Sequence, residues 1–159
     1  MLQRITALTS PVTLEEIKAH IPVNGDDNDD NLEQLLLAAT DLVEKSTNRS
    51  LTEETVWVEI LPKLPDELLK NPVISIDSFE VDGVSFSDYS LISYTYVPCA
   101  ISYTTLPAVE NNCTIQYTAG ENNPICNLCI KELVKYWYLE KEPPQSFYFL
   151  LESARLIHG

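Results

Sequence analysis

The sequence predicts an α+β fold in which N- and C-terminal helices form a small bundle, with a β-rich hairpin insertion in the middle. Segments 13–48 and 123–157 repeat apolar residues at helical spacing, whereas segment 53–120 alternates apolar and polar residues as strands do. A chain of 159 residues, 45% of them hydrophobic, is long enough for a core of its own. We therefore expect a single domain over residues 1–159.

The first helical segment opens with a start signal. Residues 13–16 read TLEE, a capping box in which the Thr13 hydroxyl accepts from the third helical amide and Glu16 reaches back to the Thr13 amide. Pro22 ends this short helix soon after His20.

A longer helix is expected to begin near Asp30. The polar run STNR at 46–49 ends it. Its apolar positions recur along one face, as in an amphipathic helix: Leu32, Leu35, Leu36, Ala39, Leu42 and Val43.

The middle segment carries strand and turn signals. Residues 54–60, ETVWVEI, alternate so that Val56, Val58 and Ile60 share one face and Trp57 lies on the other. Asp82-Gly83 separates two alternating apolar runs, and it predicts a tight hairpin because both turn residues tolerate positive φ. Residues 113–120, CTIQYTAG, read as a further strand that ends at glycine.

The last segment predicts two helices. Asn123 is a suitable cap and Pro124 a suitable first residue for one of them, and Pro143-Pro144 separates it from the other. We expect one side of the first helix to consist of Ile125, Leu128, Cys129, Leu133, Tyr136 and Trp137. In the second, the residues in register are Phe147, Leu150, Leu151 and Ala154.

The chain is strongly acidic, with 24 Asp and Glu against 10 Lys and Arg and a net charge of −14. No Lys or Arg lies between Asn71 and Ile130, where six acids occur. Because nucleic-acid binding needs cations that face phosphate, we exclude it as the main activity. No run of eighteen apolar residues occurs, so no membrane span is expected, and residues 1–12 lack the features of a signal peptide.

The acidic run PVNGDDNDDNLE at 22–33 suggests a calcium loop. An EF-hand loop that starts at Asp26 needs glycine at position 6 and glutamate at position 12, where this sequence has Asn31 and Leu37. We interpret the run as a turn followed by acids at a helix N-terminus, where the helix dipole favours them. No metal is expected.

Cysteines and histidines form no convincing site in the sequence. Cys126-x-x-Cys129 is half of a zinc pattern without its second half, and the histidines, His20 and His158, lie at opposite ends of the chain. Neither G-x-S-x-G nor a phosphate-binding loop occurs. The many carboxylates leave a glycosidase-type pair open by counting alone, but we expect no enzyme and no cofactor. Free thiols are expected at Cys99, Cys113, Cys126 and Cys129.

The aromatic run SFYFLL at 146–151 is the remaining candidate site. Phe147, Leu150 and Leu151 share the face of a core helix, whereas Tyr148 and Phe149 point elsewhere. A helix that is apolar on two faces indicates a second partner.

Two groups of residues carry a resemblance to a known family. A P-V-T-L-E-E-x-K segment at 11–18 precedes an acidic turn and a Leu/Ala helix that closes with Val43, Glu44, Thr47 and Arg49. Near the other end, a Y-x-A-G strand precedes a helix with a W-Y pair: Tyr117, Ala119, Gly120, Pro124, Trp137 and Tyr138. In this order, the motifs resemble the phage head–tail connector (adaptor, or head-completion) family over most of the chain, residues 61–112 excepted.

The resemblance implies one head–tail connector domain and a structural role in the virion, after synthesis in the host cytoplasm. Such proteins form a ring, usually of twelve copies, under the portal protein, extend the DNA channel without specific DNA binding, and support the next connector, stopper or tail protein. They involve no catalysis, cofactor or membrane. Their C-terminal part is thought to reach the portal. The corresponding interface residues, toward the portal or a neighbouring subunit, are Phe147, Tyr148, Phe149, Leu150, Leu151 and Arg155.

The charge pattern suits a conduit, because cations in the lumen would hold passing DNA. We expect the cation-free block between Asn71 and Ile130 to face the lumen, and we expect removal of residues 144–159 to abolish portal docking while the chain stays folded. Two other functions stay open: a small acidic DNA mimic that binds a basic partner, and a tail-completion protein.

Overall fold

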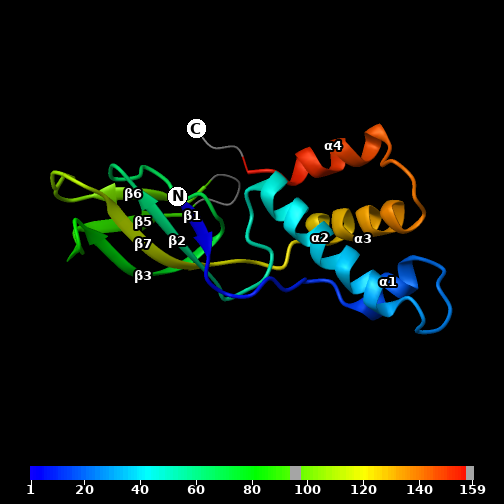
Figure 1. Ribbon diagram of the computed structural model, residues 1–159. Coiled ribbons are helices and arrows are strands. Elements are labelled where there is room, and N and C mark those ends of the chain that lie inside the picture. The colour runs from blue at the N-terminus through cyan, green and yellow to red at the C-terminus, as the bar shows by residue number, and fades with distance from the viewer. Residues whose placement is uncertain (94–97, 157–159) are drawn as a thin grey trace. The chain divides into compact units, whose positions relative to one another are not determined.

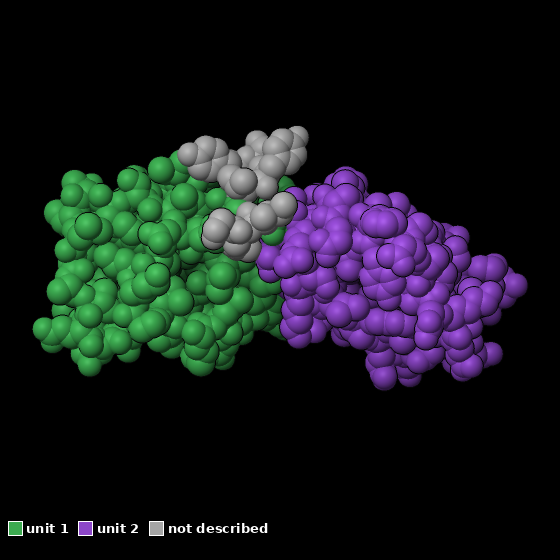
Figure 2. All heavy atoms as spheres, turned by 90° about the horizontal axis from the view of Figure 1, so that it is seen from above, with its two compact units in different colours: residues 1–7, 53–121, 156–159 green, residues 8–52, 122–155 purple. Residues whose placement is uncertain are grey.

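The computed structural model describes residues 1–93 and 98–156. The chain divides into two compact units (Figures 1 and 2). The sheet unit comprises residues 1–7, 53–121 and 156–159, and the helical unit comprises residues 8–52 and 122–155. Helices and strands are both present, so the predicted α+β class is confirmed. Each unit has its own hydrophobic core, and the single domain over residues 1–159 stays a prediction.

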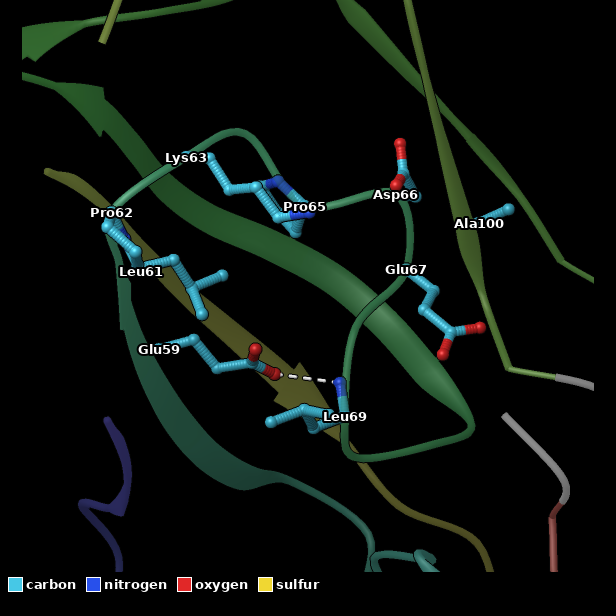
Figure 3. Close-up of a pocket in the computed structure, with 9 residues that line it drawn as sticks. All are labelled: Glu59, Leu61, Pro62, Lys63, Pro65, Asp66, Glu67, Leu69 and Ala100. Atoms are coloured by element: carbon cyan, nitrogen blue, oxygen red, sulfur yellow. Dashed lines mark hydrogen bonds between the residues drawn. The ribbon is translucent and has the colours of Figure 1, made fainter. Parts of the chain in front are cut away.

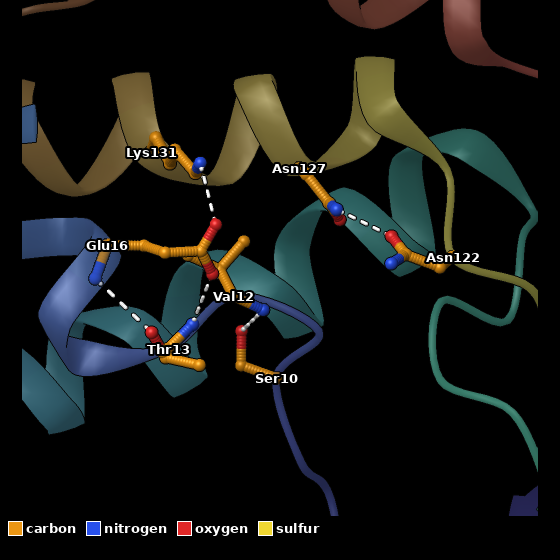
Figure 4. A network of polar contacts seen from close by, with 7 residues as sticks. All are labelled: Ser10, Val12, Thr13, Glu16, Asn122, Asn127 and Lys131. Carbon is orange, nitrogen blue, oxygen red and sulfur yellow. Dashed lines mark hydrogen bonds and ion pairs between the residues drawn. The ribbon is translucent and has the colours of Figure 1, made fainter.

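The helical unit begins its first helix where the sequence predicts. The Thr13 hydroxyl accepts from the Glu16 amide at 3.2 Å and the Glu16 carboxylate accepts from the Thr13 amide at 2.9 Å (Figure 4). Asn123 caps the third helix in the same way, by accepting from the amides of Ile125 and Cys126. The helices are α1 (Leu14–His20), α2 (Asp29–Thr47), α3 (Pro124–Tyr138) and α4 (Gln145–Ala154).

The two predicted helix ends have different outcomes. Helix α2 ends at Thr47, within the STNR run as predicted, and the next residue, Asn48, has a φ of 58°, in the left-handed region that closes many helices. Helix α4 ends at Ala154, and the predicted end of the helical region at 157 lies outside the described residues.

The core of the helical unit corrects the predicted face of α3. Ile125 and Leu128 are 41% and 43% exposed. The buried residues of this helix are Cys126, Cys129, Ile130, Leu133 and Val134. Buried positions thus recur at spacings of three and four from Cys126, and the prediction began one residue too early because it took a large Ile, rather than a small Cys, as the first core position.

The sheet unit contains a five-stranded antiparallel sheet in the order β1-β2-β7-β3-β4 and a two-stranded sheet of β5 and β6. The N-terminal strand was not predicted, because three residues are too few for an alternating pattern. The strands are β1 (Leu2–Arg4), β2 (Thr55–Leu61), β3 (Val73–Val81), β4 (Val84–Ser85), β5 (Tyr89–Ile92), β6 (Ala100–Tyr103) and β7 (Cys113–Ala119).

The predicted Asp82-Gly83 hairpin is confirmed between β3 and β4. Both turn residues have positive φ, 51° and 80°. The Asp82 carboxylate also accepts from the backbone amides of Glu110, Asn111 and Asn112 at 2.8 to 3.0 Å. These hydrogen bonds favour the charged form and lower the pKa of Asp82, so the turn residue also fixes the loop before β7.

The sheet buries one face. Along β2, Thr55, Trp57 and Glu59 are buried and the residues between them are half-buried, as the predicted alternation requires. Glu59 is 1% exposed, although a glutamate in a strand is normally on the solvent side. Its carboxylate accepts hydrogen bonds from the Tyr117 hydroxyl at 2.5 Å and from the Leu69 amide at 2.8 Å.

Candidate interaction surface

Helix α4 presents two different faces. Phe147, Leu151 and Ala154 are buried in the core of the helical unit. Tyr148 and Phe149 are 49% and 68% exposed, as the helical spacing predicts. A large apolar side chain is rarely left so open without a use.

The six residues predicted for the interface differ in their exposure to solvent. Phe147 and Leu151 belong to the core, and Leu150 packs against it. The exposed members are Tyr148, Phe149 and Arg155. The surface available to a partner is therefore smaller than the sequence suggests.

A groove beside α4 enlarges this surface. It encloses about 440 Å³, and we call it the α4 groove. Its walls come from three helices: Leu42 and Lys45 of α2, Trp137 of α3, and Tyr148 of α4. The residues from α2 and α3 were not predicted as part of a groove, because helical spacing places Leu42 and Trp137 on apolar stripes, whereas Leu42 is 41% exposed.

The rim of the α4 groove holds charges that are already paired. Lys45 binds Asp41 at 2.6 Å, and Arg155 lies 3.6 Å from Glu152. Exposed pairs of this kind contribute about 0–1 kcal/mol to stability. Because each cation has its own carboxylate, the groove suits an apolar or aromatic side chain of a protein partner better than a phosphate.

The residues that end α2 hold α4 in place. Arg49 donates from Nε to the carbonyl of Ala154 at 2.7 Å. Glu44 accepts from the Leu51 amide at 3.0 Å, and the Thr47 hydroxyl donates to the Val43 carbonyl at 2.7 Å. The closing motif of this segment is therefore structural, because it links the last turns of α2 to the end of α4.

A polar network joins α1 to α3. Lys131 of α3 binds the Glu16 carboxylate at 3.0 Å, so the capping residue of α1 also serves the contact between the two helices (Figure 4). The backbone hydrogen bond from Thr13, followed by the hydrogen bond from Lys131, lowers the pKa of Glu16. His20 also meets α3, at Glu132, 2.8 Å away.

A second cleft lies in the sheet unit (Figure 3). It encloses about 590 Å³ under the proline-containing segment Leu61–Leu69. Its lining includes Glu59, whose hydrogen bond to the Leu69 amide holds this segment against the sheet. Burial raises the pKa of Tyr117, the other partner of Glu59. The described residues that line the cleft include carboxylates and one lysine, but among them there is no Ser, Cys or His that would serve as a nucleophile or a base.

Two of the three Lys and Arg residues in the sheet unit lie against one tryptophan. The Arg4 guanidinium lies 5.0 Å and the Lys70 ammonium 5.2 Å from the Trp57 ring. At these distances both make cation–π contacts, and Lys70 is 6% exposed. Of these three side chains, Lys70 is therefore closed to DNA by burial.

The acidic run at 22–33 is engaged by a lysine. Lys18 binds the carboxylates of Asp26 and Asp29 at 2.6 and 2.8 Å. These contacts raise the pKa of Lys18 and lower that of Asp26. Within residues 1–93 and 98–156, no cluster of three or more His, Cys, Asp or Glu side chains is suited to a metal.

The cysteines are buried. All four are free thiols, as predicted, and burial raises the pKa of Cys129 to about 12. His158 lies outside the described residues. None of the described helices combines the length and apolar character that a membrane crossing needs.

Exposed aromatic side chains and an apolar groove with paired charges at its rim are features of proteins that act through contacts with other proteins. A comparison with known protein families identifies the family of this chain. Residues 11–149 match the family described as head completion protein. The chain belongs to this family, and it is a structural virion protein of the head–tail junction.

The fold matches chains in three solved gene transfer agent assemblies: the neck of an empty particle computed with C6 symmetry (TM-score 0.79, 19% identity), the virion of a native particle (0.77, 19%) and the neck of a native particle computed with C12 symmetry (0.76, 18%). Each match covers 99% of this chain and 96% of the other. No curated protein matches the sequence at a significant level.

Proposed function

We propose that the protein forms a ring, of twelve copies, beneath the portal protein, where it extends the DNA channel and supports the next connector, stopper or tail protein. Family membership supports the head–tail junction as its place. The match to neck chains over nearly the whole fold supports the ring, since those necks were computed with six- and twelve-fold symmetry. We also propose the finer predicted arrangement, in which a helical bundle with a β-rich insertion forms one connector domain.

The observation that carries portal docking is the exposed aromatic pair on α4. Tyr148 contributes to the α4 groove, and Phe149 is the more exposed of the two. Interface energy concentrates in a few residues of this type. We assign portal contact to Tyr148, Phe149 and Arg155, with Phe147, Leu150 and Leu151 as the packed base that holds them.

Charge supports passage of DNA without capture. The segment between Asn71 and Ile130 has no Lys or Arg, and the exposed acids within it repel phosphate. We propose that this segment faces the lumen. A ring structure whose channel is lined by Lys63, Lys70 or Lys131 would overturn this assignment.

A pull-down with the portal protein tests the docking proposal. Removing residues 144–159 is a poor test, because α4 supplies Phe147, Leu151 and Ala154 to the core and its loss is expected to destabilise the helical unit. Phe149→Ala is better, since this side chain is exposed. We expect about tenfold weaker binding to the portal, as for an interface residue worth more than 1 kcal/mol.

Ile125→Ala is the matched control, because it removes an exposed apolar side chain from α3 at similar cost to the fold. Equal binding by the wild type and Phe149→Ala would refute docking through α4. Light scattering across a concentration series, with and without portal protein, tests the ring. A chain that stays small and binds only a basic partner, in a salt-sensitive manner, would instead indicate a DNA mimic.

A further inference from the structure

One reactive pair of residues lies in the turn between α1 and α2. Asn24 is the only asparagine of the chain that a glycine follows, and Asp82-Gly83 is the one aspartate pair of this kind. The side-chain carbonyl of Asn or Asp lies within reach of the next backbone nitrogen, with which it can close a five-membered ring. Glycine has no Cβ to hinder that approach. The main chain of this protein is therefore most open to reaction with its own side chains at these two pairs.

The reaction at Asn24 replaces an amide by a carboxylate. The Gly25 nitrogen gives up its proton to hydroxide and attacks the side-chain carbonyl carbon of Asn24. A C–N bond forms, and the side-chain nitrogen takes a proton from water and leaves as ammonia. Water then opens the cyclic imide at either of its carbonyl groups, which yields aspartate or isoaspartate at position 24. The net reaction consumes a water molecule and releases ammonia, so it needs no enzyme, oxidant or cofactor.

The surroundings of Asn24 leave this reaction unobstructed. Asn24 and Gly25 are both exposed, and among the described residues no hydrogen bond holds the Asn24 side chain or the Gly25 amide. Gly25 has a φ of 82°, and a Cβ at this position would meet no atom within 4 Å. The backbone around Asn24 can therefore rotate to bring the attacking nitrogen onto the carbonyl carbon without breaking a hydrogen bond of either residue.

Asp82-Gly83 has the same spacing of groups but is protected. The Asp82 carboxylate accepts from the amides of Glu110, Asn111 and Asn112 at 2.8 to 3.0 Å, which fixes the side chain and favours its charged form. A carboxylate anion resists nucleophilic attack, because it must gain a proton before it can lose water. Strands β3 and β4 pair on both sides of this turn, so rotation there would break the hairpin. The structure, rather than the glycine alone, therefore distinguishes the two pairs.

We propose that Asn24 is a site of spontaneous deamidation, at which the protein accumulates aspartate and isoaspartate as it ages. A virion protein is not renewed after assembly, so the product builds up with the age of the particle. Each conversion adds one negative charge to the acidic run at 22–33, and isoaspartate also adds a carbon atom to the main chain of the turn. Residues 24–28 belong to neither hydrophobic core, so we expect the fold to persist. The proposal is independent of the proposed ring.

Ageing of the purified protein in native buffer and in urea tests the site. Peptide mass spectrometry measures the exchange of amide for carboxyl at each asparagine, and electron-transfer fragmentation distinguishes isoaspartate from aspartate. In native buffer we expect Asn24 to react at least about tenfold faster than Asn122, whose Oδ1 accepts from Asn127 at 2.6 Å and which no glycine follows. Because the turn needs no unfolding to react, urea should change the Asn24 rate by less than about twofold, whereas isoaspartate at Asp82 should form only in urea. A native rate at Asn24 that is equal to the Asn122 rate, or about tenfold below the Asn24 rate in urea, overturns the proposal.

Two substitutions supply the matched controls. Asn24→Gln keeps the amide but lengthens the side chain, so ring closure is much slower, and we expect the charge change of the ageing protein to disappear. Gly25→Ala adds a Cβ beside the attacking nitrogen, and we expect conversion of Asn24 to slow by about tenfold. Since a φ of 82° is strained for alanine, thermal unfolding verifies the fold of both variants. A charge change that continues at the wild-type rate in Asn24→Gln, or an unchanged rate at Asn24 in folded Gly25→Ala, overturns the proposal.

Discussion

The two units place their buried polar groups at different kinds of site. The core of the helical unit is made of aliphatic, aromatic and cysteine side chains, from Ile17 and Leu32 to Ile130. The sheet unit has a comparable apolar cluster, but beside it lie Glu59 and Lys70, both buried, with Tyr117 between them. The helical unit also buries polar side chains, among them Glu44 and Arg49. These join the end of α2 to residues beside it and to the end of α4, whereas the network of the sheet unit orders a segment that lies between strands.

The buried network explains how the sheet unit orders a segment with little regular structure. The Tyr117 hydroxyl donates to Glu59 and accepts from the Lys70 amide at 3.1 Å. Asn71 donates to the Leu68 carbonyl and accepts from the Cys99 amide, both at 2.7 Å. These hydrogen bonds join the segment before β3 to β2, to β7 and to Cys99. A loop that lacks periodic packing needs such hydrogen-bond partners to be ordered.

The largest expected effect tests the apolar side of this comparison. Ile130→Ala removes a fully buried side chain from the helical unit, and we expect the free energy of unfolding to fall by about 2–5 kcal/mol. Hydrogen exchange should accelerate most in α2 and α3. Acceleration that is equal in the sheet unit would show that the two cores unfold as one, and Ile125→Ala is the control at an exposed position of the same helix.

A smaller effect is expected from the buried network. Tyr117→Phe keeps the ring and removes the hydroxyl, which leaves the Lys70 amide and one Glu59 contact unmet. We expect a loss of about 1–3 kcal/mol, with faster exchange of the amides of Leu69 and Lys70 and little change in α3. If exchange at these two amides is unaltered, the hydroxyl does not order the segment.

Removal of the capping box should cost less. Thr13→Ala deletes the hydroxyl that accepts from the Glu16 amide, and we expect a loss of about 1 kcal/mol in chemical denaturation. An unchanged free energy of unfolding in Thr13→Ala would contradict the assignment of the cap.

The smallest effect concerns Asp82 and depends on pH. Its pKa is lowered in the folded protein, so its contribution is present above the unfolded pKa of about 3.9 and is lost as the pH falls through the folded value. Amide exchange and chemical shifts at Asn111 should therefore change below about pH 4 in the wild type. In Asp82→Asn this acid transition should vanish; persistence of the transition would assign it to another carboxyl.

Structural features that neighbouring residues determine could be predicted from the sequence. The capping box at Thr13 and the Asp82-Gly83 turn were predicted because neighbouring residues alone determine them. The exposure of Tyr148 and Phe149 followed from helical spacing. The buried face of α3 was predicted in part. Cys129 and Leu133 are buried as expected. The start of the stripe was assigned wrongly, since both Ile125 and Cys126 begin a plausible stripe and only packing against α2 decides between them.

Features with distant partners could not be predicted. Burial of Glu59 requires Tyr117, which is 58 residues away, and an alternating strand allows a glutamate on either face. The α4 groove needs Leu42 and Trp137 from two other helices, so its lining depends on how three helices pack. Strand β1 is only three residues long and gains its identity from pairing with β2.

Neither unit is made of one continuous stretch of chain. The sheet unit combines residues 1–7 with 53–121, and the helical unit combines 8–52 with 122–155. During synthesis on the ribosome, β1 cannot pair until β2 has emerged, and β2 cannot pair with β7 until Cys113–Ala119 has emerged. Likewise, α1 and α2 cannot complete their packing until α3 and α4 have emerged. Folding of both units is therefore delayed until most of the chain has emerged, and contacts of such long range close slowly. Nascent copies made side by side on one messenger would expose unpaired strands and apolar helices together, and their mutual negative charge is what keeps them apart during that interval.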